Sequence, residues 1–340
     1  MKPFGVALAY MAFLTGTLSA QDDLSDLVNP FLPFPSTANR RGTDDRPGPW
    51  DSDVLIYRAS ATGSAQLTAT FSRAGVPTVA RLKDGRLMAA HQHFPSNDAA
   101  NFDKVAVHFS KDEGNTWSTP EVISLTGLPA GMRFPFDPTL VPLPDGRVRL
   151  YFTSHAGETM TAIYSAVSDD GLHFTYESGA RFAVEGQMVV DCAVALHDGM
   201  FHLFAPVPRL SRNGGGEPQR QEGRGYHAVS RDGLAFQRME DVRMEGRRDW
   251  LGNVQSVDGK LVFIGTGEPG ASKPASGVRR AGIWMAESTD GNSWKLLTQC
   301  PAVPGADPGG VKTRDGAWIL AVTGEPREGT ASARRMGIRY

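Results

Sequence analysis

Short runs of alternating apolar and polar residues fill most of the chain, and five pairs of such runs are joined by Asp-Gly. The five pairs read "VARLKDGRLMAA", "TLVPLPDGRVRLYF", "AVALHDGMFHLF", "NVQSVDGKLVFIG" and "GVKTRDGAWILAV". Alternation with a period of two predicts β-strands, and glycine accepts the positive φ that a tight turn requires. Each pair therefore predicts a β-hairpin. The Asp-Gly positions recur 53 to 61 residues apart, which indicates a repeated structural unit.

A second motif recurs with the same spacing. Its four copies, "SKDEGNTW", "SDDGLHF", "SRDGLAF" and "STDGNSW", begin at Ser110, Ser168, Ser230 and Ser288. A short Asp side chain accepts backbone hydrogen bonds within a turn, Gly supplies an unusual φ, and the aromatic ring can pack between sheets. The motif therefore predicts a structural turn, and its aspartates are not candidate catalytic residues.

Four strands per repeat without a helical period predict an all-β fold, a β-propeller of five four-stranded blades. A six-bladed propeller is the alternative. The fifth repeat, with its hairpin at Asp315, leaves Met336–Tyr340 as its third strand and no fourth strand. Because an open sheet edge invites aggregation, we expect an N-terminal strand, Asp53–Tyr57 or Gln66–Phe71, to close the ring.

The N-terminus has the features of an export signal. Lys2 precedes a mostly apolar run that ends in small residues before the polar Gln21, and the run is too short to span a membrane. We interpret residues 1–20 as a signal peptide, 21–52 as an irregular Pro-rich lead-in and 53–340 as one propeller domain. The protein is thus expected to be exported, to the periplasm or the extracellular space.

Composition narrows the classes of partner. The formal net charge is −2 and Lys and Arg are scattered, so nucleic acid is not an expected partner. Only two cysteines occur, Cys192 and Cys300, which excludes a disulfide framework. No spacing typical of zinc or calcium sites is found, so we expect neither a metal nor a cofactor.

Candidate chemistry is expected at one end of the propeller axis. The first strand of each blade lines the axis, and the loops that enter first strands share a face with the loops that leave second strands. The loops into first strands carry four acids, Asp137, Asp191, Asp249 and Asp307; the second-strand exits carry His91, His93, His155, Glu268 and Glu325. The long exit Pro206–Tyr226 fits either a mobile rim over this face or a solvated loop.

Carboxylates that converge on an axis repel one another, which raises some pKa values and suits general acid and base catalysis. Glycoside hydrolysis commonly uses two carboxylates and no cofactor. The alternative for each acid taken alone is a turn or capping role at the start of a strand.

Two family resemblances add to this interpretation. The Ser/Asp/Gly/aromatic motif resembles the Asp-box of the sialidase and BNR-repeat propellers, in which it lies on the face opposite the substrate. The segment "FDPTLVPLPDGRVRLYF" resembles a blade of the five-bladed glycoside hydrolases, the arabinanase, xylosidase and invertase-like group. The second resemblance implies that Asp137 tunes the pKa of the catalytic acid or stabilises the transition state, and that Asp191 stands where the general acid, usually Glu, is found.

The chain departs from both patterns. The position of the base or nucleophile in that hydrolase group falls at Val76 in "GVPTVA", so Asp51, Asp53 or Glu268 would have to replace it. The sialidase arginine triad has no clear counterpart, although Arg133 and the Arg40-Arg41 pair are candidates for binding a carboxylate.

Two hypotheses follow. The first is a secreted glycosidase-like enzyme that acts on a glycan or polysaccharide. Its pocket acids would be Asp137 and Asp191, with Glu268 or Asp307 assisting and with substrate contacts from His91, Arg133, His155, Asp249 and Glu325. The second is a non-catalytic propeller that binds carbohydrate or protein, since a fold does not dictate a function.

Overall fold

The computed structural model describes residues 49–60, 63–157, 159–207, 223–245, 248–267 and 282–325. All of them belong to the compact unit Pro33–Tyr340. Several segments discussed above lie outside the described residues. They are the expected signal peptide, nearly all of the expected lead-in, Glu268, Met336–Tyr340 and most of the Pro206–Tyr226 exit.

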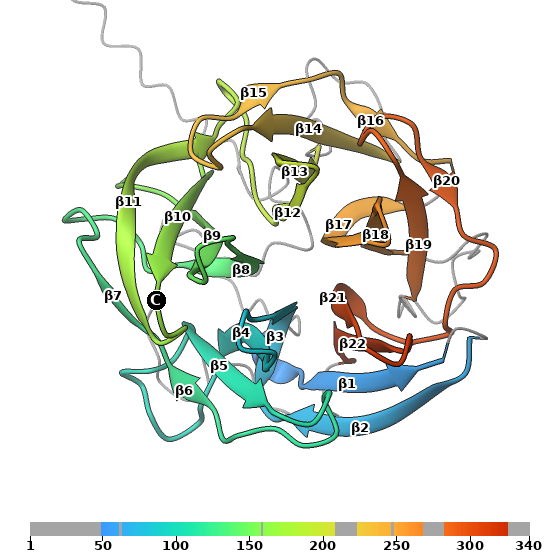
Figure 1. The fold of residues 1–340 in the computed structure, drawn as a ribbon. Helices are drawn as coiled ribbons and strands as arrows, with labels where there is room; N and C mark the ends of the chain where they lie inside the picture. Colours follow the sequence, from blue (N-terminus) through green and yellow to red (C-terminus); the bar gives the residue numbers. More distant parts are fainter. Residues whose placement is uncertain are drawn as a thin grey trace, which may run out of the picture. The chain divides into compact units, whose positions relative to one another are not determined.

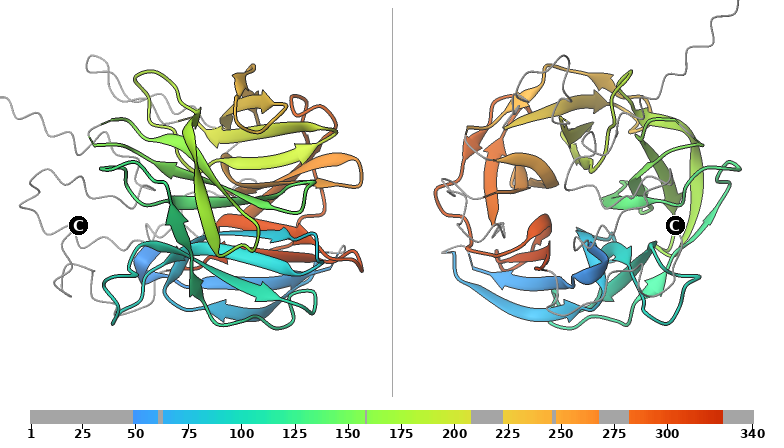
Figure 2. Two further views of the ribbon diagram at one scale, coloured as in Figure 1. Left: turned by 60° about the vertical axis from the view of Figure 1, so that its left-hand side comes forward. Right: turned by 180° about the vertical axis from the view of Figure 1, so that it is seen from behind.

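Five small sheets are arranged as blades around a central axis (Figures 1 and 2), which confirms the predicted five-bladed propeller. Blade one consists of β3 (Ala74–Arg81), β4 (Leu87–His93), β5 (Lys104–Ser110) and β6 (Glu121–Val122). Blade two consists of β8 (Phe136–Pro142), β9 (Val148–Ser154), β10 (Ala162–Ser168) and β11 (His173–Phe182), with β7 (Ser124–Thr126) parallel to β11. Blade three consists of β12 (Ala193–His197), β13 (Met200–Pro206), β14 (Arg224–Ser230), β15 (Gln237–Arg238) and β16 (Val242–Arg243).

Blade four consists of β17 (Asp249–Val257), β18 (Lys260–Thr266), β19 (Ile283–Ser288) and β20 (Lys295–Leu296). Blade five consists of β21 (Ala306–Lys312), β22 (Trp318–Thr323), β1 (Val54–Ala59) and β2 (Ala65–Phe71), and the 3₁₀ turn η2 (Pro49–Asp51) precedes β1. In every blade the first two strands are one of the five predicted hairpins, and the first strands of neighbouring blades contact one another around the axis.

The ring is closed by both N-terminal strands. Strand β1 pairs with β22 from Val54–Thr323 to Ala59–Trp318, and β2 pairs with the other edge of β1. The expected closure from the N-terminus is therefore confirmed. The assignment of Met336–Tyr340 as the third strand of this blade was wrong, because β1 occupies the edge of β22 and buries Val54 and Ile56 completely.

The Ser/Asp/Gly/aromatic motif forms a hydrogen-bonded turn after the third strand of blades one to four, on the hairpin side of the ring. In the copy after β19, the Ser288 hydroxyl donates to Asp290 Oδ1 (2.9 Å) and accepts from the Gly291 amide (2.9 Å). The amides of Asn292 and Ser293 also donate to Asp290 Oδ1, and these bonds lower the pKa of Asp290 to about 2. These hydrogen bonds confirm that the motif is a structural turn, as predicted.

The first copy of the motif is one residue longer, and the extra residue, Glu113, joins blade one to blade five. Its carboxylate accepts two hydrogen bonds from Arg81 of blade one (2.7 and 2.8 Å) and one from Arg314 Nη1 of blade five (3.1 Å). These contacts, led by the Arg81 hydrogen bonds, lower the pKa of Glu113.

We expect Glu113→Gln to lower the free energy of unfolding by about 1–3 kcal/mol at pH 7, because charged hydrogen bonds across the ring closure are lost. A carboxyl whose pKa is lowered by folding stabilises the protein above its unfolded pKa of about 4.3, and the effect disappears as pH falls through its folded pKa. Urea unfolding at pH 7 and pH 3 measures both. Glu287→Gln is the control, since Glu287 is equally exposed (25% against 24%) but pairs with Lys260 inside blade four. Equal losses in the two variants would argue against a special role of this contact.

Candidate functional site

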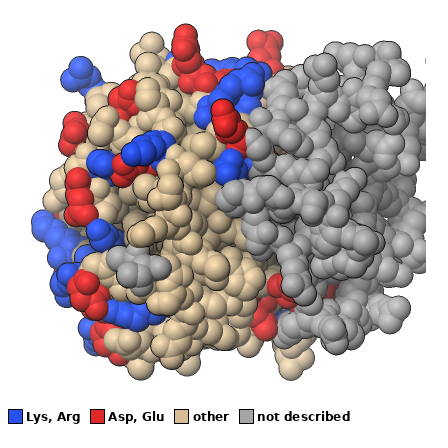
Figure 3. All heavy atoms as spheres, turned by 90° about the vertical axis from the view of Figure 1, so that its right-hand side faces the viewer, with Lys and Arg blue, Asp and Glu red and all other residues tan. Residues whose placement is uncertain are grey.

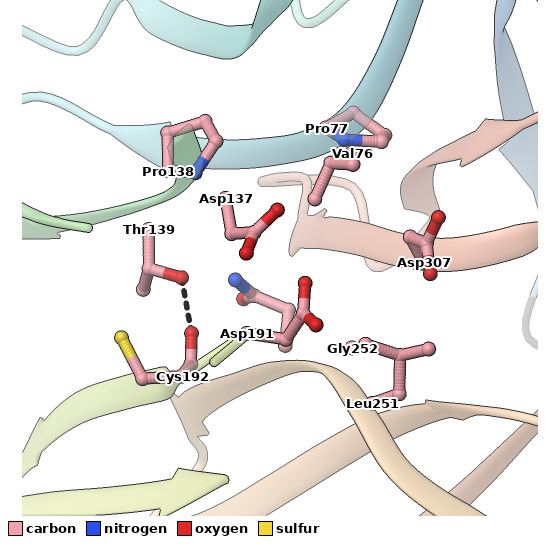
Figure 4. Close-up of a pocket in the computed structure, with 11 residues that line it drawn as sticks. Val76, Pro77, Asp137, Pro138, Thr139, Asp191, Cys192, Leu251, Gly252 and Asp307 are labelled. Carbon is pink, nitrogen blue, oxygen red and sulfur yellow. Dashed lines mark hydrogen bonds between the residues drawn. The ribbon is translucent and has the colours of Figure 1, made fainter. Parts of the chain in front are cut away.

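A small pocket lies on the axis where the first strands begin (Figure 4), and its volume of about 10 Å³ is room for about one water molecule. Its lining residues are Val76, Pro77, Asp137, Pro138, Thr139, Asp191, Cys192, Leu251, Gly252, Asn253 and Asp307. The structure therefore brings together three of the four acids that the sequence placed at the starts of first strands.

Each blade contributes an equivalent backbone position to the pocket. Val76, Asp137, Asp191 and Asp307 have φ of 51°, 49°, 53° and 49°, and Gly252 takes the corresponding place in blade four with φ of 154°. Strand register shifts at Val76, Asp137 and Asp307, as in a β-bulge, which turns the side chain toward the axis, and in blade four it shifts just before Gly252. Asp tolerates this left-handed conformation, whereas it is unusual and strained for a β-branched Val.

Asp137 and Asp191 are neighbouring carboxyl groups that interact, and the buried Oδ2 of Asp137 has no hydrogen-bond partner among the described residues. Asp137 is only 3% exposed, and burial is the main reason why its pKa is raised. The pKa of Asp191 is raised well above its usual value by burial and then by the charges of Asp137 and Asp307. Two carboxyl groups this close cannot both ionise readily, so the pair retains a proton near neutral pH.

Asp307 is not part of that pair. Burial raises its pKa to about 6, and a hydrogen bond with Thr323 opposes the rise. Figure 4 shows Asp137 and Asp191 together and Asp307 set apart from them.

Two threonines that interact with these acids, Thr153 and Thr323, tie neighbouring blades together, and a third, Thr266, accepts the amide of Asp307 (2.9 Å). The hydroxyl of Thr153, which bonds to the Asp137 carboxylate, accepts the amide of Asp191 (3.1 Å). In the same way Thr323, which bonds to Asp307, accepts the amide of Val76 (2.8 Å). These threonines were not predicted from the sequence. A recurrent Thr-Ser or Thr-Gly at the ends of second strands, in "YFTS", "IGTG" and "AVTG", could have identified them.

The inner wall of the pocket contains polar groups that are hydrogen-bonded between blades. Thr139 Oγ1 donates to the carbonyl of Cys192 (2.5 Å), and Asn253 Nδ2 donates to Thr78 Oγ1 (3.1 Å). Burial raises the pKa of the Cys192 thiol well above its usual range, so this thiol is not a nucleophile. These contacts fix the first strands of blades one to four relative to one another.

The structure places the predicted histidines outside the lining of the pocket. His91 is buried between blades, where its Nε2 lies 3.1 Å from Nε2 of His108 and Phe71 of blade five packs against both rings. His93, beside it, has its pKa lowered by burial. His155 is partly exposed on the loop after β9, with Nδ1 2.9 Å from the carbonyl of Gly157.

Arg133 lies close enough to the pocket for its charge to lower the pKa of Asp137. Its guanidinium is held by Asp103 (2.6 Å) and lies over the Phe136 ring (4.1 Å). Asp249 begins β17, but the axial position of blade four belongs to Gly252. Glu325 is exposed just beyond β22.

The two alternative acids near the N-terminus are also placed. Asp51 is buried in η2, and Asp53 Oδ1 accepts the amide of Arg73 (2.7 Å) at the start of β1. Neither lines the pocket.

Asp137→Asn is expected to raise the free energy of unfolding at pH 8 by about 1–3 kcal/mol and to leave it unchanged at pH 4. A carboxyl whose pKa is raised by folding costs the least stability at low pH, where it is protonated in both the folded and the unfolded state. It destabilises the fold as pH rises above its unfolded pKa of about 3.9. Urea unfolding at both pH values measures this. Asp290→Asn should have the opposite sign at pH 8, because folding lowers the pKa of Asp290. A loss of stability in Asp137→Asn at pH 8 would show that Asp137 is not a buried, destabilising acid.

The described residues contain no group of three or more His, Cys, Asp or Glu side chains arranged to hold a metal ion. Among the same residues, no helix is long and apolar enough to cross a membrane. On the side of the molecule shown in Figure 3, the described Lys and Arg side chains stand among Asp and Glu side chains rather than in a patch of one sign.

No protein-family model matches the chain, and no curated protein matches it. Among solved structures, it is similar to a thermostable family-43 glycoside hydrolase, with 13% identity, a TM-score of 0.50 and coverage of 76% of this chain and 94% of that one. It is also similar to an N-acetylgalactosamine deacetylase from F. plautii in complex with blood group B trisaccharide (14%, TM-score 0.51, coverage 77% and 82%). A third is the GH32 beta-fructofuranosidase of Bombyx mori (12%, TM-score 0.52, coverage 78% and 57%). At these identities the likeness shows the fold, which is that of five-bladed propellers that include glycoside hydrolases.

Proposed function

We propose that this protein is an exported glycoside hydrolase that cleaves a glycan or polysaccharide at the axial pocket. The observation that carries the proposal is the convergence of Asp137, Asp191 and Asp307, from three different blades, on one pocket at the axis. The similarity of the fold to glycoside hydrolase propellers supports it. So does the resemblance of the recurrent turn motif to the Asp-box of sialidase-like propellers.

Asp191 is the proposed general acid. It is partly exposed whereas Asp137 is buried behind it, so Asp191 is the member of the pair that can reach a glycosidic oxygen. The pair retains a proton near neutral pH, which Asp191 can donate to the leaving group. Asp137 holds that proton in place and keeps Asp191 from ionising early.

The pair acts as one catalytic unit. Glycosidases hold their two catalytic carboxyl groups apart, by about 5–5.5 Å or about 6.5–9.5 Å. Asp137 and Asp191 interact with each other and both have raised pKa values, so we assign them together to the acid role. The second role requires another carboxylate, for which Asp307 and Glu268 were the candidates from sequence.

Substrate contacts are proposed on the same face. Arg133, next to Asp137, suits a carboxylate or hydroxyl group of the substrate, and His155 stands at the exit of β9. A contact of the substrate with His91, Asp249 or Glu325 remains a prediction from the sequence.

The test is hydrolysis of a panel of aryl glycosides, sialosides, arabinans and fructans by the purified protein and by Asp191→Asn. Asp198→Asn is a matched control, since Asp198 also has positive φ (47°) but lies in the β12–β13 turn at the opposite end of the first strand. Turnover that is lost only in Asp191→Asn supports the proposal. Glycan binding without turnover by the wild type would favour the alternative, a non-catalytic binding propeller, which Val76 at the expected position of the base already suggests.

A further inference from the structure

The proposed hydrolase lacks an acid at the first-blade position, where Val76 stands. Because Asp137 and Asp191 act as one unit, the pocket needs a second carboxylate that is separated from them. The inference below rests on the proposed function and names the residue that completes the site.

We propose that Asp307, from blade five, is the catalytic base of this pocket and replaces the carboxylate that is missing at Val76 in blade one. Asp307 occupies the same bulge position as Asp137, with the same φ (49°). Among the described residues that line the pocket, it is the one carboxylate outside the Asp137–Asp191 pair.

The arrangement of blades sets Asp307 apart from the pair. Around a ring of five blades every position has two neighbours and two non-neighbours, and Asp137 and Asp191 are neighbours. Blade five is not adjacent to blade two or blade three, so Asp307 faces the pair from across the axis. Residue 76 in blade one is likewise not adjacent to blade three. Positions 76 and 307 are therefore both two blades away from Asp191.

The protonation states suit the two roles. Asp307, with a pKa of about 6, is mostly ionised at pH 7, while the pKa of Asp191 is raised well above its usual value, which favours its protonated form. A base and an acid thus coexist in one pocket near neutral pH, as acid–base catalysis requires.

The reaction step balances with these two groups. The Asp307 carboxylate takes a proton from a water molecule as the water oxygen bonds to the anomeric carbon. The bond from that carbon to the leaving oxygen breaks, and Asp191 gives its proton to this oxygen. Asp307 ends protonated and Asp191 ionised, and exchange with solvent restores both.

Val76 helps to keep Asp307 ionised. Blades one and five are neighbours, and the Val76 amide and Asp307 carboxylate share the hydroxyl of Thr323. A carboxylate at position 76 would stand beside Asp307 as Asp137 stands beside Asp191, and would raise the pKa of Asp307 in the same way. An apolar side chain there avoids this, despite the strain of Val at positive φ.

The test compares wild type, Asp307→Asn, Val76→Asp and the double variant Val76→Asp/Asp307→Asn, with thermal unfolding to establish that each is folded. Asp307→Asn keeps a partner for Thr323 and is expected to lower kcat/KM at least about 100-fold. The double variant is expected to recover at least about tenfold over Asp307→Asn, because it restores a carboxylate at the equivalent position. Val76→Asp alone is expected to move the acidic limb of the pH–rate profile above pH 6.

The outcomes separate this inference from the proposed function. A folded Asp307→Asn with wild-type turnover, alongside an inactive Asp191→Asn, would overturn the role of Asp307 and leave the glycosidase standing. A folded double variant no more active than Asp307→Asn would overturn the equivalence of positions 76 and 307. Absence of turnover by the wild type on every substrate would overturn both proposals.

Discussion

Replacing Asp191 with asparagine is expected to reduce turnover of a natural glycan by about 10³- to 10⁴-fold, because the leaving oxygen then departs without a proton. Asparagine preserves the size of the side chain and tolerates the positive φ at this position. The loss therefore measures the missing proton rather than a change of shape.

The dependence of this loss on the leaving group identifies the role of Asp191. When the leaving group is an acidic phenol, as in an activated aryl glycoside, it departs without protonation. The turnover of such a substrate should therefore fall far less than that of an alkyl glycoside or a natural glycan. Steady-state kcat/KM on both substrate types, for wild type and Asp191→Asn, measures this difference. Equal losses on both would show that Asp191 is not the proton donor.

The pH profile provides an independent readout. Wild-type kcat/KM should rise through about pH 6 as Asp307 ionises and fall where the Asp137–Asp191 pair loses its proton. The alkaline limb depends on the proton of Asp191, so it should disappear in Asp191→Asn while the acidic limb remains. Asp198→Asn, which removes a carboxylate from the opposite end of a first strand, should keep both limbs.

The fold was largely predictable because each blade is built from local signals. An Asp-Gly turn, its two flanking strands and the following Ser/Asp/Gly turn lie within one repeat, so their chemistry is visible in a short window of sequence. The closure of blade five by an N-terminal strand was predicted only from its missing strand, because the pairing itself joins Val54 to Thr323 across nearly the whole chain and has no local signal. No residue in "VLIYRA" distinguishes a partner of β22 from any other strand.

The site was predictable in its acids and less so in its other residues. Asp137 and Asp307 stand at the bulge of a first strand and Asp191 shares their positive φ just before β12, whereas Asp249 precedes Gly252 by three residues. The bulge itself has no sequence signal, because Val and Asp both occupy it. His91 illustrates a second limit. Both faces of a propeller strand are covered by neighbouring blades, so alternation does not tell a side chain directed at the pocket from one buried between sheets.

The largest expected loss of stability follows from removing Trp250 at the contact between blades three and four. This side chain is fully buried, and its ring lies 4.7 Å from Phe263, 5.2 Å from Trp294 and 5.6 Å from Phe204, measured between ring centroids. Its indole nitrogen also donates to the carbonyl of Gly223 (3.0 Å). Trp250→Ala should therefore lower the free energy of unfolding by about 3–5 kcal/mol, through the cavity and the lost aromatic contacts.

Denaturant unfolding at pH 7, with Trp318→Ala as the control, measures the loss of stability. It tests whether this loss depends on where the tryptophan lies or follows from the removal of any tryptophan. Trp318 is only partly buried, at the start of β22, so its removal should cost less than half as much. Trp250→Phe should be intermediate, because it keeps part of the ring packing and loses the hydrogen bond to Gly223. Similar losses for Trp250→Ala and Trp318→Ala would contradict a dominant aromatic cluster between blades three and four. If the cluster is dominant, stability comes from contacts between blades well away from the axis, and the strained, acid-lined pocket can be kept for chemistry.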